Sequence, residues 1–193
     1  MKPLYPVRHG DLLALMEETL AEIEKSDIAE LSASPQAFNE CVKQPDVIEV
    51  SMGWMKSAIN DKVIFTRDLA DCSAIALCTN YDQSTGMYAQ RSLMHAVGSN
   101  LNMCDGAEDI LSMIQMAYES SSKPKCIIAL GSEVAEEHFA AIANQEVKTR
   151  EGRLVKPFAE LQMLCDTIIL ERNKGIAVRP DGTYAVLRNH HHG

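Results

Sequence analysis

The sequence lacks two features that would place it at a membrane or on nucleic acid. No apolar run approaches the roughly 20 residues that a membrane-spanning helix needs, and the first ten residues lack the long apolar stretch of a secretory signal. Acidic residues outnumber basic ones, 27 against 18, and the formal net charge is −9. No positive surplus is therefore present to attract nucleic acid phosphates or anionic lipids. We expect no nucleic acid and no membrane among the partners.

Closely spaced cysteine pairs are absent as well. The six cysteines stand at positions 41, 72, 78, 104, 126 and 165, and no two of them have Cys-x-x-Cys spacing. Structural zinc normally takes two closely spaced ligand pairs, so we expect no metal site. Several cysteines lie inside apolar runs, which indicates buried thiols in a reducing compartment, and we expect a cytoplasmic location.

What the chain does have is enough apolar material for one ordinary domain. Of its 193 residues, 46% are hydrophobic and 23% charged. We expect an N-terminal helical extension over 1–46, which includes an amphipathic helix with an acidic side over 11–25. The main domain is expected over 47–189. The His-His-His-Gly end, 190–193, is a tail, either native or a tag remnant, and is left out of functional reasoning.

Hydrophobic patterning within the main domain predicts strands first and helices later. Strands are expected over 47–52, 62–66, 73–78, 87–97, 125–130 and 161–170, helices over 107–120 and 133–144, and a hairpin over 175–187. This order predicts an α+β fold in which mainly antiparallel β-sheets pack on each other and helices flank their outer faces.

The connection between the second and third predicted strands holds the candidate nucleophile. Cys72 stands at the start of a strand beside this short connection, where a rigid scaffold can display a reactive group. His95 is the available base, and an antiparallel hairpin that turns near residue 84 would bring it close to Cys72. A third group is needed to hold the imidazole in one tautomer, and Thr66, Asp71 and Asp105 are the candidates.

These residues carry a resemblance to a known family. The run Thr66-x-x-Leu69-x-x-Cys72, followed by a small apolar strand and then by Leu93-Met94-His95, resembles the signature of the CheD chemoreceptor glutamine deamidases. The likeness extends loosely over 47–188, by order of elements more than by identity. Ala70-Asp71 stands where the family has Gly-Ser, and Gly131 where it has a doubled glycine. The cytotoxic necrotizing factors share this Cys-His fold, so the resemblance implies a CheD/CNF-like sandwich.

The resemblance also implies an activity. Cys72 would be the nucleophile, His95 the base and Thr66 the group that orients it, in a hydrolase that converts a protein glutamine to glutamate through a thioester, with release of ammonia. Backbone N–H groups of Cys72 and the residues just before it would bind the oxyanion. No cofactor is implied, and the partner would be a protein that presents a glutamine side chain. The family's range leaves open a chemotaxis-related role or that of a bacterial effector delivered into a host cell.

Other interpretations stand beside this one. Cys72 and His95 could be core residues and Thr66 a strand former. The domain would then be a catalytically inactive protein-interaction module on the same fold. A thiol amidohydrolase acting on chain-terminal Asn or Gln is a further alternative. We expect His138 to lie on the surface, outside the site, and Met103 to fill core space.

Overall fold

The structure is a computed structural model that describes residues 35–103 and 105–188; the helix expected over 11–25 and the tail at 190–193 lie outside these ranges. The elements in chain order are α3 (Pro35–Val42), β1 (Ile48–Glu49), β2 (Met55–Ile59), β3 (Ile64–Arg67), β4 (Ser73–Asp82), β5 (Met87–Ala96), α4 (Gly106–Tyr118), β6 (Lys125–Leu130), α5 (Glu133–Ala143), β7 (Val147–Lys148), β8 (Leu154–Val155), α6 (Pro157–Leu164), β9 (Asp166–Leu170), β10 (Asn173–Val178) and β11 (Tyr184–Arg188).

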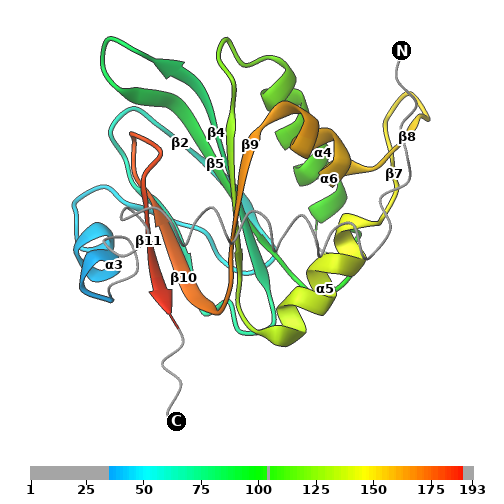
Figure 1. Ribbon diagram of the computed structural model, residues 1–193, viewed down its shortest axis with the longest axis horizontal. Coiled ribbons are helices and arrows are strands. Elements are labelled where there is room, and N and C mark those ends of the chain that lie inside the picture. The colour runs from blue at the N-terminus through cyan, green and yellow to red at the C-terminus, as the bar shows by residue number, and fades with distance from the viewer. Residues whose placement is uncertain (1–34, 104, 189–193) are drawn as a thin grey trace.

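Two sheets packed face to face form the centre of the fold. One has the strand order β1-β3-β10-β11 and the other the order β2-β5-β4-β6-β9. Neighbouring strands are antiparallel except in the pairs β1–β3 and β6–β9, which are parallel. Helix α3 covers the outer face of the four-stranded sheet, and α4, α5 and α6 lie on the other side of the molecule, against the five-stranded sheet (Figure 1). The predicted α+β fold of packed, mainly antiparallel sheets with flanking helices is confirmed.

The layer between the sheets combines small and aliphatic side chains. Its buried residues include four alanines among aliphatic neighbours: Ala58, Ala74, Ala76 and Ala129. Small side chains on facing strands let two sheets approach closely, so that polar groups on one can reach the other. The aromatic residues Phe139 and Phe158 lie beneath the three helices, on the outer face of the five-stranded sheet.

Four details of the predicted element order are wrong. The strand expected with its lead-in over 161–170 is present only as β9, Asp166–Leu170, because 161–164 belong to helix α6. Residues 157–164 are apolar on nearly all sides, which removes the periodicity that separates helix from strand. The strand expected over 47–52 is reduced to β1, and β2 was not predicted because its sequence, MKSAI, has one β-branched residue. The hairpin of β7 and β8 was also missed.

The domain boundary expected at residues 46/47 stays a prediction. Within the extension, α3 buries Phe38 and Cys41 against the sheet residues Phe65, Ala177 and Ala185.

In the part of the chain that the structure describes, no helix has the length and apolar character needed to cross a membrane.

Arg91 is a buried cation that ties the β4–β5 hairpin to the loop before β3. Its side chain is fully buried, and its guanidinium donates hydrogen bonds to the carbonyl oxygens of Asn60, Lys62 and Tyr88 at 2.6–2.8 Å. The carbonyls of Asn60 and Lys62 belong to the turn after β2, where no strand ladder could satisfy them. The arginine therefore replaces backbone pairing at this corner of the fold.

We expect Arg91→Met to lower the free energy of unfolding by about 2–4 kcal/mol, because three carbonyl acceptors lose their donor. Urea denaturation measures this change. Arg67→Met is the control, since its ion pair with Glu49 is about half exposed and should contribute less than about 1 kcal/mol. Equal losses in the two variants would contradict the role of Arg91.

Candidate functional site

The loop from β3 to β4 presents Cys72 through a tight turn. Asp68 and Ala70 both have positive φ angles, 59° and 39°. The N–H of Cys72 donates to the carbonyl of Leu69, and the N–H of Leu69 donates to the carbonyl of Lys174. The left-handed conformation is costly for a residue with a Cβ, so the loop holds local strain directly before the thiol.

Gly131 supports this loop from the end of β6. Its N–H donates to the carbonyl of Cys72 at 3.1 Å. A Cβ at position 131 would lie 2.0 Å from the carbonyl oxygen of Ala70, far inside van der Waals contact. Only glycine lets the loop pack this closely against β6.

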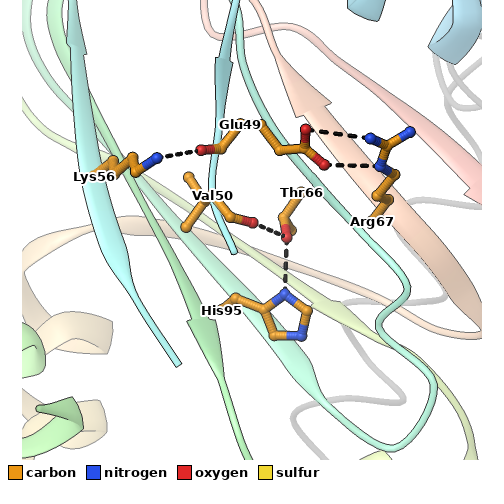
Figure 2. A network of polar contacts seen from close by, with 6 residues as sticks. All are labelled: Glu49, Val50, Lys56, Thr66, Arg67 and His95. Carbon is orange, nitrogen blue, oxygen red and sulfur yellow. Dashed lines mark hydrogen bonds and ion pairs between the residues drawn. The ribbon is translucent and has the colours of Figure 1, made fainter. Parts of the chain in front are cut away.

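Thr66 and His95 are in direct contact between the two sheets (Figure 2). The Thr66 hydroxyl donates to the carbonyl of Val50 at 2.7 Å, and its oxygen lies 2.8 Å from Nδ1 of His95. A hydroxyl has one proton, and a carbonyl can only accept, so that proton goes to Val50. Oγ1 must therefore accept from the Nδ1–H of His95. In a neutral imidazole this leaves Nε2 unprotonated and able to accept a proton.

The surroundings of His95 keep it neutral. Its side chain is 1% exposed, and burial lowers the pKa of the imidazole below its usual 6.5, while the charge of Asp68 acts in the opposite direction. Nε2 is buried and has no hydrogen-bond partner among the described residues. A buried acceptor without a hydrogen-bond partner lowers the stability of the fold, so it calls for a role other than folding. Nε2 is therefore a candidate base.

The backbone on both sides of His95 is held by the turn before β2. The N–H of His95 donates to the carbonyl of Trp54 at 3.0 Å, and the N–H of Gly53 donates to the carbonyl of His95 at 2.9 Å. Glu49, in β1, accepts two further hydrogen bonds. Its carboxylate accepts one from Arg67 and its backbone carbonyl accepts one from Lys56 (Figure 2). These contacts join β1, β2 and β3 around Thr66 and limit the movement of the imidazole.

Cys72 directly precedes β4, at the end of the strand where His95 lies. Ala74, two residues after Cys72, pairs directly with His95 in the β4–β5 register. Within the described ranges the thiol makes no hydrogen bond to Nε2. Burial raises the pKa of the thiol, a backbone hydrogen bond from Gly98 lowers it, and the charge of Asp71 raises it. The resting pair is thus a neutral thiol and a neutral imidazole.

Of the three residues considered for orienting His95, the structure brings only Thr66 into contact with its ring. The carboxylate of Asp71 accepts from the hydroxyl of Ser132 at 2.8 Å, and the same hydroxyl caps α5 by accepting from the N–H of Ala135. Asp105 stands at the start of α4. Both acidic candidates are therefore wrong for this role.

His138 was expected to lie outside the site, but it contacts the loop that directly precedes Cys72. Its Nδ1 lies 3.1 Å from the carbonyl oxygen of Asp71. Sequence reasoning missed this contact because it depends on how α5 packs against a loop more than sixty residues away in the chain. Ser132 thus holds the side chain of Asp71, and His138 holds its backbone carbonyl.

The expected oxyanion donors also need a correction. The N–H of Cys72 is already used in the turn with Leu69. The N–H groups of Ala70 and Asp71 donate to no residue in 35–103 or 105–188. These two groups, both directly before the thiol, are the donors that remain free for an oxyanion.

The rest of the molecule offers less chemistry. No group of three or more His, Cys, Asp or Glu side chains in the described ranges is arranged to hold a metal ion. A groove of about 580 Å³ lies between α4 and the β7–β8 hairpin, and its lining includes Ser112, Tyr118, Arg150 and Arg153 but neither Cys72 nor His95. Cys78 is fully buried, and burial raises its pKa to about 12, as expected for a core thiol.

We expect Thr66→Val to change the tautomer of His95. Without the hydroxyl, Nδ1–H loses its acceptor, so the proton should redistribute toward Nε2, and stability should fall by about 1–2 kcal/mol. Imidazole nitrogen chemical shifts measure the tautomer. Thr66→Ser keeps the hydroxyl and should keep the Nδ1–H form. A wild-type protein already in the Nε2–H form would refute the assignment.

We expect Ala70→Gly to raise the free energy of unfolding by about 0.5–1 kcal/mol, since glycine adopts a positive φ without strain. Ala89→Gly is the control, because Ala89 is exposed in β5 and should lose about 0.5–1 kcal/mol from the same change. Equal destabilisation of both variants, measured by urea denaturation, would show that the loop holds no strain at Ala70.

Comparisons with known proteins give little beyond this geometry. No protein-family model matches the chain, and no curated protein matches it. Among solved structures, the crystal structure of the hypothetical protein YfiH from Bacillus licheniformis matches with a TM-score of 0.32 and 15% identity, over 88% of this chain and 73% of that one. A likeness this weak shows no family for the chain.

Proposed function

We propose that the protein is a cysteine-dependent hydrolase that deamidates glutamine side chains of proteins. The observation that carries the proposal is the unpartnered, unprotonated Nε2 of His95, whose ring is held by Thr66 and whose strand partner, Ala74, follows Cys72 by two residues. The CheD-like spacing of Thr66, Cys72 and His95 supports the same assignment of roles.

The reaction begins with a proton transfer. As the substrate enters, Nε2 of His95 takes the proton of the Cys72 thiol, and the sulfur attacks the carbon of the carboxamide. The N–H groups of Ala70 and Asp71 stabilise the negative oxygen. When the carbon–nitrogen bond breaks, His95 gives its proton to the leaving nitrogen, and ammonia departs from a thioester.

Water completes the cycle. Nε2 takes one proton from a water molecule, whose oxygen attacks the thioester carbon. The carbon–sulfur bond breaks, the proton passes to the sulfur, and glutamate and the free thiol remain. Thr66 keeps Nδ1–H pointing at its hydroxyl throughout, so that Nε2 is always the nitrogen that exchanges protons.

One observation favours the second candidate, a catalytically inactive protein-interaction module. The pKa of Cys72 is raised, so few thiolates are present at neutral pH without help from a base. If His95 never reaches the thiol, Cys72 is as inert as Cys78. The two candidates therefore differ in whether the reactivity of Cys72 depends on His95.

We expect Cys72 to react with iodoacetamide at neutral pH, and His95→Ala to slow this reaction about tenfold or more. In the variant the rate should rise only as the pH approaches the raised pKa of the thiol, above 9. Peptide mass spectrometry gives the rate for each cysteine, with Cys78 as the internal control. If Cys72 reacts as slowly as Cys78 in the wild type, the catalytic proposal fails.

Deamidation itself is tested with cell lysates in heavy-oxygen water. Hydrolysis of the thioester puts one heavy oxygen into the new glutamate, which mass spectrometry locates. Sites labelled by the wild type but by neither Cys72→Ser nor His95→Ala would support the proposal. Heavy-oxygen glutamates that form equally with Cys72→Ser would contradict it.

A further inference from the structure

Two large apolar side chains stand beside His95 on the turn that leads into β2. This turn is closed by a hydrogen bond from the N–H of Trp54 to the carbonyl of Ser51 at 3.1 Å, with Gly53 at a φ of 79°. Met52 and Trp54 are 57% and 61% exposed. Because the turn is hydrogen-bonded to the backbone of His95, both side chains are held at the same end of the five-stranded sheet as the proposed base.

A third exposed apolar residue is connected to Cys72 through Gly98. Met103 was expected to fill core space, but it is 48% exposed. A Cβ atom added at Gly98 would lie 3.2 Å from the sulfur of Met103, so these two residues are close neighbours. The backbone of Gly98 in turn hydrogen-bonds to Cys72. Trp and Met are enriched where proteins contact one another, whereas single exposed apolar residues are ordinary. We call Met52, Trp54 and Met103 the apolar rim.

The loop on the other side of Cys72 is acidic. Asp68 and Asp71 are both exposed, and they are the charged residues that act on His95 and Cys72 respectively. Of the neighbouring cations, Arg67 is paired with Glu49, so the two carboxylates outnumber the remaining one, Lys174, which contacts the loop through its backbone carbonyl. With a net charge of −9 on the whole chain, this side of the site favours a positively charged partner.

We propose that the substrate glutamine lies in an exposed protein segment beside a lysine or arginine, which meets Asp68 and Asp71, while apolar residues of the partner cover the apolar rim. This inference rests on the proposed function and names its substrate class. The cation has a second effect: it offsets the negative charge of Asp71, which otherwise disfavours the thiolate. A basic neighbour in the substrate therefore both binds the site and eases the first proton transfer.

Peptides that carry a chloroacetyl amide on a short side chain in place of glutamine test this inference, because they alkylate Cys72 without requiring turnover. One peptide has lysines beside this residue and another has glutamates, both with leucines further out. We expect the lysine peptide to label Cys72 about tenfold faster at low salt, and the difference to shrink as salt is added. Uncharged iodoacetamide gives the reference rate.

Substitutions assign the effect to residues. The double variant Asp68→Asn with Asp71→Asn should remove most of the charge preference. The amide oxygen of an asparagine side chain at position 71 can still accept from Ser132. Trp54→Ala should slow both peptides relative to iodoacetamide. Ile59→Ala is the matched control, because Ile59 is apolar, similarly exposed and lies at the far end of β2. It should leave the labelling rate of each peptide, relative to that of iodoacetamide, unchanged.

The outcomes separate the two proposals. If both peptides label at equal rates while iodoacetamide labelling stays fast and dependent on His95, the substrate inference is wrong and the proposed function stands. A preference for the glutamate peptide would also overturn the inference. If iodoacetamide labelling is slow and indifferent to His95, the proposed function fails and the inference fails with it.

Discussion

A single hydroxyl proton determines what His95 can do. Thr66 belongs to the four-stranded sheet and His95 to the five-stranded sheet, and the hydroxyl joins them while its proton goes to Val50. Had the carbonyl of Val50 been elsewhere, the hydroxyl could have donated to Nδ1 and left the proton on Nε2. One backbone carbonyl thus decides which imidazole nitrogen is left unprotonated, and this is the nitrogen that the proposed mechanism uses as the base.

This contact requires the two sheets to lie close together, and the small residues between them allow it. Ala74 is the residue directly opposite His95 on β4, and Ala58, Ala76 and Ala129 share the same layer. Larger side chains at these positions would push the sheets apart and separate Thr66 from the ring. Aliphatic residues such as Ile64, Leu93 and Ile127 fill the rest of the layer.

The sequence predicted the fold better than the details of the site. β6 is a run of β-branched and small residues, and its bounds, Lys125–Leu130, match the prediction; the hairpin of β10 and β11 was marked by its Pro-Asp-Gly turn. The all-round apolar α6 carried no such signal. In the site, spacing alone left Thr66, Asp71 and Asp105 as equal candidates to orient His95, and the resemblance favoured Thr66. The direction of the Asp71 side chain depends on α5, which no local pattern reveals.

Two locally unfavourable features meet in this site, and they bear on the choice between enzyme and binding module. Ala70 adopts a positive φ where glycine would fit without strain, and Nε2 of His95 is buried without a partner among the described residues. Such costs concentrate where function requires them, since elsewhere a substitution would readily remove them. A module that only binds a partner gains nothing from a buried, unprotonated imidazole nitrogen. A hydrolase does gain, because an unprotonated imidazole nitrogen can take the proton of a thiol as the sulfur attacks.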